Sequence, residues 1–163
     1  MNETVPVIYN HGAPEPPLRV HHRVIAVLVA LACLAVLVVA ARLTPSPTGV
    51  GTHMPLTSKP CDLLARTGMP CPSCGMTTSF AWFTKGNLLA SFYVQPMGAL
   101  LALLSSACVW GGFYIALTGR PAHRLLRLVP ARYTLLPLLI VGALAWGWKI
   151  LIHLNGIDGW NAQ

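Results

Sequence analysis

The sequence predicts an all-α membrane protein with three transmembrane helices and a short interfacial helix that follows a cysteine-bearing loop. The first observation behind this prediction is composition: 55% of the 163 residues are hydrophobic and only 9% are charged, whereas soluble domains carry about 25% charged residues. A single core of this size cannot hide so much apolar surface, but a lipid bilayer can cover it. The second observation is that three long apolar segments interrupt the chain.

The predicted transmembrane helices cover residues 24–43, 96–118 and 133–154. Each has about 20 residues, which is enough to cross a hydrocarbon core of about 30 Å. Strands are excluded, because an open strand leaves backbone groups unpaired in lipid and the segments lack the two-residue alternation of a barrel strand. The first segment also exceeds the apolar run of about 7–15 residues of a signal peptide, so an uncleaved anchor is expected.

These helices define a single membrane domain over residues 24–154. It follows a polar, proline-bearing N-terminal tail over residues 1–23 and precedes a short tail over residues 155–163. Residues 58–94 are predicted to hold the cysteine loop and the interfacial helix.

The interfacial helix is predicted from an apolar stripe. Met76, Phe80 and Phe83 lie at positions i, i+4 and i+7, which places them on one helix face. Gly86 and Asn87 should end this helix, and the Asn87 side chain can then cap a second short one. Pro96 suits the first turn of the next membrane helix, where its missing N–H does no harm.

Basic residues predict the orientation in a bacterial inner membrane. Three crossings place six of the eleven Lys and Arg residues on the side of the N-terminal tail, four of them in the short 119–132 connection. The positive-inside rule then favours a cytoplasmic N-terminus and an extracytoplasmic cysteine loop.

Five residues are predicted to lie at the membrane interface. Lys149 is close to a helix end and is expected to snorkel to the surface, while Trp148 beside it suits an aromatic belt. Leucines lie among the arginines of the 119–132 connection, so a short amphipathic turn is expected there. Its interfacial cations are Arg120, Arg124 and Arg127.

Charge and motifs exclude several functions. The net charge of +7 comes from scattered basic residues without a dense run, so lipid headgroups and not nucleic acid are the expected partner. Only four acidic residues exist, none in a predicted span, and the common phosphate-binding and hydrolase motifs are missing. These facts argue against a hydrolase, a phosphate-driven pump and a carboxylate proton path.

Any chemistry would have to lie in the loop, where Cys61, Cys71 and Cys74 follow the pattern C-x9-C-x2-C. Two of them can form a disulfide staple, which an extracytoplasmic location would preserve. All three can instead bind zinc with His53 or Asp62 as the fourth ligand. A thiol redox role for Cys71 and Cys74 is a further alternative, although the usual βαβ setting is missing. The other two cysteines, Cys33 and Cys108, are expected to be small hydrophobes in the membrane helices.

The loop resembles a bacterial membrane family called domain of unknown function 2752. The resemblance spans roughly residues 58–115 and rests on Cys61, the Thr67–Thr77 motif T-G-x-P-C-P-x-C-G-x-T, Gly86-Asn87 and Pro96. It implies a membrane protein in which the cysteines are important, and it implies no reaction. Members of this family usually have arginine where this chain has Thr78, so a role of that arginine would be missing here.

The sequence therefore predicts a non-catalytic accessory or structural subunit of a larger membrane complex. Its extramembrane loop would be stapled by a disulfide or by zinc, and other membrane subunits are its expected partners. Three helices are few for a transporter, and glycine and tryptophan faces suit helix docking. The alternative is a thiol redox or metal-handling membrane protein that uses Cys71 and Cys74.

Overall fold

The computed structural model describes residues 18–54, 61–119 and 131–160, and all regular structure within these ranges is helical. Three of the helices are long and apolar enough to cross a membrane: α1, α6 and the Leu136–Leu154 part of α8. The predicted fold class is therefore confirmed. The helices are α1 (Val20–Arg42), α3 (Asp62–Thr67), α4 (Met76–Thr84), α5 (Leu88–Val94), α6 (Pro96–Thr118) and α8 (Ala131–Leu154).

The observed helix bounds follow local signals. The helix α6 begins at Pro96 and ends at Thr118, and it is capped by Gly119, whose φ of 65° is a left-handed conformation that glycine adopts without strain. The helix α1 begins at Val20, earlier than expected, because its first turn holds histidines and Arg23, which are compatible with a helix at a membrane boundary. The Asn87 side chain accepts a hydrogen bond from the Ala90 N–H at 3.0 Å, as predicted for an N-cap.

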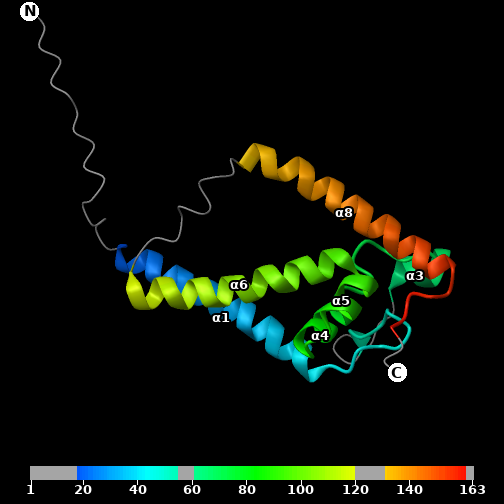
Figure 1. The fold of residues 1–163 in the computed structure, drawn as a ribbon, viewed down its shortest axis with the longest axis horizontal. Helices are drawn as coiled ribbons and strands as arrows, with labels where there is room; N and C mark the ends of the chain where they lie inside the picture. Colours follow the sequence, from blue (N-terminus) through cyan, green and yellow to red (C-terminus); the bar gives the residue numbers. More distant parts are fainter. Residues whose placement is uncertain (1–17, 55–60, 120–130, 161–163) are drawn as a thin grey trace, which may run out of the picture.

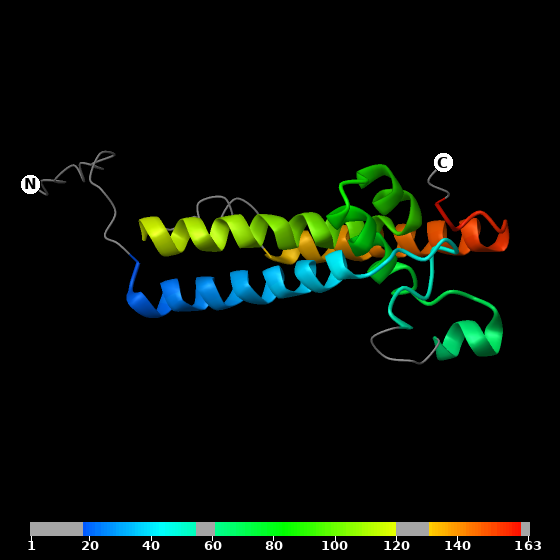
Figure 2. The ribbon, with the colours of Figure 1, turned by 90° about the horizontal axis from the view of Figure 1, so that it is seen from below.

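The three long helices alternate in direction, so the end of α1, the start of α6 and the end of α8 lie at the same end of the molecule (Figures 1 and 2). The short helices α3, α4 and α5 gather at this end, as does the C-terminal end of the described chain. The described part of the cysteine loop therefore lies at one end of the long helices.

The helices α1 and α6 lie side by side because small residues meet between them. A side chain at Gly112 would place its Cβ 2.6 Å from the Ala30 Cβ and 2.7 Å from the Ala26 carbonyl oxygen. Close backbone approach through small residues is the usual way in which membrane helices associate, since lipid gives no hydrophobic drive between them.

The helices α4 and α5 are locked together by buried serines. The Ser79 hydroxyl donates to the Ser91 carbonyl oxygen at 2.9 Å, and the Ser91 hydroxyl donates to the Ser79 carbonyl oxygen at 2.8 Å. A Cβ at Gly98 would lie 2.9 Å from the Ser79 Cβ, so α6 also closes tightly on α4. These contacts fix the positions of α4 and α5 relative to each other, and the cysteine turn directly precedes α4.

The helix α8 joins this base through its C-terminal half. Ala145, Lys149 and Ile152 form its buried stripe, at positions i, i+4 and i+7. The Trp146 indole N–H donates to the Pro70 carbonyl oxygen at 3.0 Å, and the Trp148 indole N–H donates to the Tyr93 carbonyl oxygen at 2.8 Å. The other half of α8 leans away from α1 and α6 (Figure 1).

A candidate metal centre of three cysteines

The three loop cysteines meet at one point. The Sγ atoms of Cys61, Cys71 and Cys74 all lie within 4.8 Å of one another, and those of Cys71 and Cys74 are 2.9 Å apart. All five cysteines of the chain are free thiols in this structure. Tetrahedral zinc with Zn–S bonds of about 2.3 Å holds its sulfur ligands about 3.8 Å apart, which lies between the 2.9 Å that separates the Cys71 and Cys74 sulfurs and the 4.8 Å limit of the group.

A tight turn presents Cys71 and Cys74 together. The Cys74 N–H donates to the Cys71 carbonyl oxygen at 3.0 Å, and Gly75 follows with a φ of 86° before α4 begins. The buried Gln95 side chain donates to the Pro72 carbonyl oxygen at 2.9 Å and holds the turn from the start of α6. Two residues between the cysteines therefore place both sulfurs on the same side of the turn.

Cys61 approaches the other two cysteines from the N-terminal end of α3. It occupies the N-cap position of this six-residue helix, in which no residue is buried. Gly68, with a φ of 68°, ends α3, and the buried Pro70 leads the chain back to Cys71. The sequence predicted the cysteine cluster but not α3, because six residues are too few to show a helical period.

The environments of the thiols differ in their effect on acidity. The pKa of the Cys61 thiol is lowered from 9.0 to about 7, chiefly because the Leu64 backbone N–H donates to its sulfur. The pKa of the Cys74 thiol is raised from 9.0 to about 12, chiefly because burial disfavours its thiolate. In the metal-free protein Cys61 is therefore the first of these two to ionise.

This difference predicts a pH-dependent modification pattern in the metal-free protein. The thiolate is the reactive form of cysteine. Alkylation of Cys61 should therefore speed up by about tenfold between pH 6 and pH 8, with a midpoint near 7, while Cys74 stays unmodified. Peptide mass spectrometry after short pulses of iodoacetamide measures both rates. Equal rates at the two cysteines would contradict the prediction.

The lowered pKa of Cys61 also makes the folding stability depend on pH. Since the pKa of Cys61 is lower in the folded than in the unfolded chain, ionisation favours the folded state. That contribution is fully present above pH 9 and is lost as the pH falls through about 7.

A cavity of about 720 Å³ adjoins the three thiols, and His53 lies on its wall together with all three cysteines. The sequence named His53 as the fourth zinc ligand, and the structure places it at the same cavity, although outside the compact group of three sulfurs. Asp62, the other candidate, is exposed in the first turn of α3. Three of the four predicted ligands are thus brought together, with His53 nearby.

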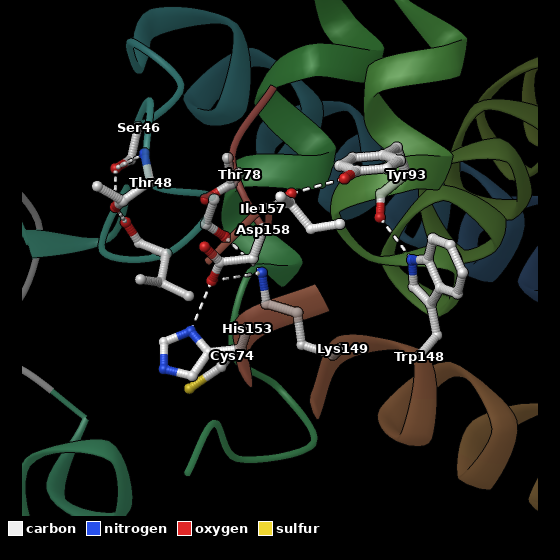
Figure 3. A network of polar contacts seen from close by, with 12 residues as sticks. Ser46, Thr48, Cys74, Thr78, Tyr93, Trp148, Lys149, His153, Ile157 and Asp158 are labelled. Carbon is white, nitrogen blue, oxygen red and sulfur yellow. Dashed lines mark hydrogen bonds and ion pairs between the residues drawn. The ribbon is translucent and has the colours of Figure 1, made fainter. Parts of the chain in front are cut away.

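A buried ion pair lies beside the cysteine turn (Figure 3). The Lys149 ammonium donates to the Gly49 carbonyl oxygen at 3.2 Å and lies 3.5 Å from an Asp158 carboxylate oxygen. The His153 Nδ1 lies 2.7 Å from the same oxygen. The segment that carries Asp158 is also held by α5, since the Tyr93 hydroxyl donates to the Ile157 carbonyl oxygen at 2.6 Å.

The structure differs here from the expected snorkelling of Lys149. Its side chain is 0% exposed and is paired within the protein, because Asp158 folds back to offer it a counter-charge. Sequence reasoning missed Asp158, although a lysine in an apolar helix and an acidic residue just beyond the helix end were a usable signal. Trp148 is 40% exposed at this end of α8. The other predicted interfacial residues, Arg120, Arg124 and Arg127, lie outside the described residues.

Gly75 is required where the turn meets the ion pair. A Cβ at this position would lie 2.8 Å from the Gly49 carbonyl oxygen and 3.2 Å from the Lys149 Nζ, in addition to the strained φ of 86°. Gly75→Ala should therefore lower the free energy of unfolding by about 2–4 kcal/mol, the sum of backbone strain and displaced neighbours.

Gly68→Ala is the matched control for Gly75→Ala. It carries a similar φ of 68° but has nothing within 4 Å of its Cβ, so only the backbone cost of about 1–2 kcal/mol is expected. Denaturant titration in detergent micelles compares the two variants. Equal losses would show that the contacts around Gly75 contribute nothing.

The fold and this site define an integral membrane protein that carries a group of three cysteines at one end of its helices. Residues 61–109 match the family described as "Protein of unknown function (DUF2752)", which confirms the predicted resemblance over that segment. No curated protein and no solved structure matches the chain. At the position where the family resemblance implies arginine, Thr78 is buried and its hydroxyl lies 2.7 Å from that of Thr52.

Proposed function

We propose that the chain is a non-catalytic subunit of a larger membrane assembly, and that Cys61, Cys71 and Cys74 bind one zinc ion that staples its extramembrane loop. The observation that carries this proposal is the convergence of three sulfurs from two separate segments within 4.8 Å. Thiolates are soft ligands that suit zinc, and three cysteines with one histidine are a common structural set.

A metal explains the third sulfur better than a disulfide does. A disulfide would use two of the three thiols and leave the other one idle. The helix α3 also needs an external anchor, because it has six residues and none of them is buried, and such a short helix is not stable alone. Zinc bound by Cys61 and by the Cys71–Cys74 turn would tie α3 to α4, with a binding free energy of about 10–16 kcal/mol in small zinc domains.

His53 is the proposed fourth ligand. It lies on the wall of the cavity that all three cysteines line, and an imidazole nitrogen is a common ligand of zinc. A closed set of four protein ligands is typical of structural zinc. The site would then hold the loop in shape and take no part in a reaction.

The subunit role is supported by the surface of α8. Leu136 and Leu139 are each at least 65% exposed on the half of α8 that leans away from α1 and α6. Lipid or the helices of other subunits can cover this surface. The protein would lie in a bacterial inner membrane with a cytoplasmic N-terminus and an extracytoplasmic cysteine loop, as the distribution of its basic residues indicates.

Metal analysis tests the zinc proposal. Protein purified in mild detergent should contain about one zinc per chain, and cobalt should replace it and give the intense sulfur-to-cobalt absorption of thiolate ligands. Three alkylatable loop thiols together with no bound metal and no such absorption would overturn it. The subunit role is tested separately by affinity purification, where stoichiometric partners are expected and a monodisperse monomer would contradict it.

A second function is favoured by one specific contact. The Sγ atoms of Cys71 and Cys74 are 2.9 Å apart, so in the absence of metal these thiols are placed for thiol–disulfide chemistry. We propose redox chemistry of this pair as the alternative. Under this alternative Cys74→Ser should trap a mixed disulfide between Cys71 and a client protein, and non-reducing electrophoresis followed by mass spectrometry would find it. Recovery of no such adduct would count against it.

A further inference from the structure

The cavity beside the thiols is lined both by the end of a membrane helix and by the cysteine turn. One wall consists of the last turns of the membrane helix α1, including Val36 and Val39, whose side chains are 52% and 45% exposed on a face that lipid would contact. Cys71 and Cys74 line the same cavity. A molecule that lies along the last turns of α1 would therefore share this cavity with the thiols.

The lining suits a flat, neutral head group with an apolar chain. Met76 and Phe80 offer a sulfur and an aromatic ring for stacking. Ser73 and Thr77 bring hydroxyl groups that can donate hydrogen bonds to carbonyl oxygens. The volume of about 720 Å³ lies within the range of roughly 300–1,000 Å³ that is usual for small-molecule sites.

We propose that this cavity admits a lipid-soluble quinone, which oxidises the thiols of Cys71 and Cys74 in the metal-free protein. The proposal rests on the second function given above, the redox role of this pair. Two thiols lose two electrons and two protons and form one S–S bond, and the quinone takes up both electrons and both protons to become the quinol. The products are one disulfide and one quinol.

A quinone fits this place better than an acyl chain or a water-soluble oxidant. An acyl chain would fill the apolar part but offers no oxygen that could accept a hydrogen bond from the Ser73 or Thr77 hydroxyl. A polar oxidant gains nothing from the apolar wall of α1. A quinone joins a chain that the wall accepts to two carbonyl oxygens and a two-electron capacity that matches the dithiol.

The test uses the full-length protein in lipid nanodiscs, stripped of metal with a chelator and kept without oxygen. Addition of a short-chain quinone should yield one quinol per chain by absorbance and one Cys71–Cys74 disulfide by peptide mapping. Zinc added beforehand should prevent both, because it occupies the same sulfurs.

Two variants of α1 test the route through the cavity. In Val36→Trp the larger side chain would occupy part of the cavity. The rate of quinol formation should then fall by about tenfold or more, because the quinone ring can no longer reach the thiols. Val38→Trp is the matched control: Val38 is 47% exposed on the same helix but does not line the cavity, so the rate should stay near that of the unmodified protein. Equal rates in the two variants, or no quinol, would overturn the proposal.

A soluble oxidant distinguishes a failure of the quinone proposal from a failure of the redox function. If diamide forms the Cys71–Cys74 disulfide while the quinone does not, the redox function stands and the quinone proposal falls. If neither forms it, both fall. The zinc proposal is judged by its own metal analysis and is independent of all these outcomes.

Discussion

Replacing Cys71 by serine is expected to lower the zinc affinity of the chain by about a hundredfold or more, equivalent to about 2.8 kcal/mol. Serine keeps the size of the side chain but offers a hard hydroxyl, which remains protonated and is a poor ligand for zinc. Cys71 is the informative position because it is adjacent in space to Cys74, at 2.9 Å between the sulfurs, and belongs to the group of three that Cys61 completes.

Loss of the metal should also release α3. No residue of this helix is buried, so without a staple between Cys61 and the Cys71–Cys74 turn the α3 segment should open locally and exchange its amide hydrogens faster. Competition with a chromophoric chelator measures the affinity, and hydrogen exchange measures the opening.

Cys33→Ser is the control for Cys71→Ser. Cys33 lies in α1, outside the group of three sulfurs, so this variant should keep both zinc and the protection of α3. An unchanged affinity in Cys71→Ser would show that this sulfur is not a ligand. A lowered affinity without faster exchange in α3 would show that the metal is bound but does not staple the helix.

The parts of the fold that sequence predicted depend on local chemistry. Apolar length is sufficient to define a membrane helix, and the bounds of α6 follow from proline at one end and glycine at the other. The Asn87 cap depends on a residue and an N–H three positions away. The proximity of Cys71 and Cys74 likewise follows from a spacing of two residues within one turn.

The parts that sequence did not predict depend on contacts between distant segments. Lys149 reaches Gly49, a hundred positions away, and Asp158 returns from beyond the end of α8. The hydrophobic periodicity of the sequence carries no information about contacts between such distant residues. The cavity arises in the same way, because α1 contributes one wall and the loop and α4 contribute the other. Helix α3 was missed for a different reason, because six residues are too few to show a helical period.

The largest stability effect is expected at Asp158. Asp158→Asn should lower the free energy of unfolding by about 3–5 kcal/mol, because it leaves the fully buried Lys149 ammonium without its counter-charge. Lys149→Met should cost less, since the carboxylate left behind keeps His153 at 2.7 Å and lies nearer the surface. Unfolding in mixed detergent micelles, followed by tryptophan fluorescence, gives these values.

Asp62→Asn is the control for charge alone. Asp62 is exposed in α3, so its neutralisation should change the free energy of unfolding by no more than about 1 kcal/mol.

The double variant Lys149→Met/Asp158→Asn decides whether the ion pair itself stabilises the fold. Removing both charges leaves no buried ion, and replacing a buried pair by neutral groups is often close to neutral in stability. The double variant should therefore recover most of the stability that Asp158→Asn loses, with a coupling energy of about 2–3 kcal/mol between the two positions. Losses that simply add would instead mean that each residue acts through its own contacts, Lys149 through the Gly49 carbonyl and Asp158 through His153.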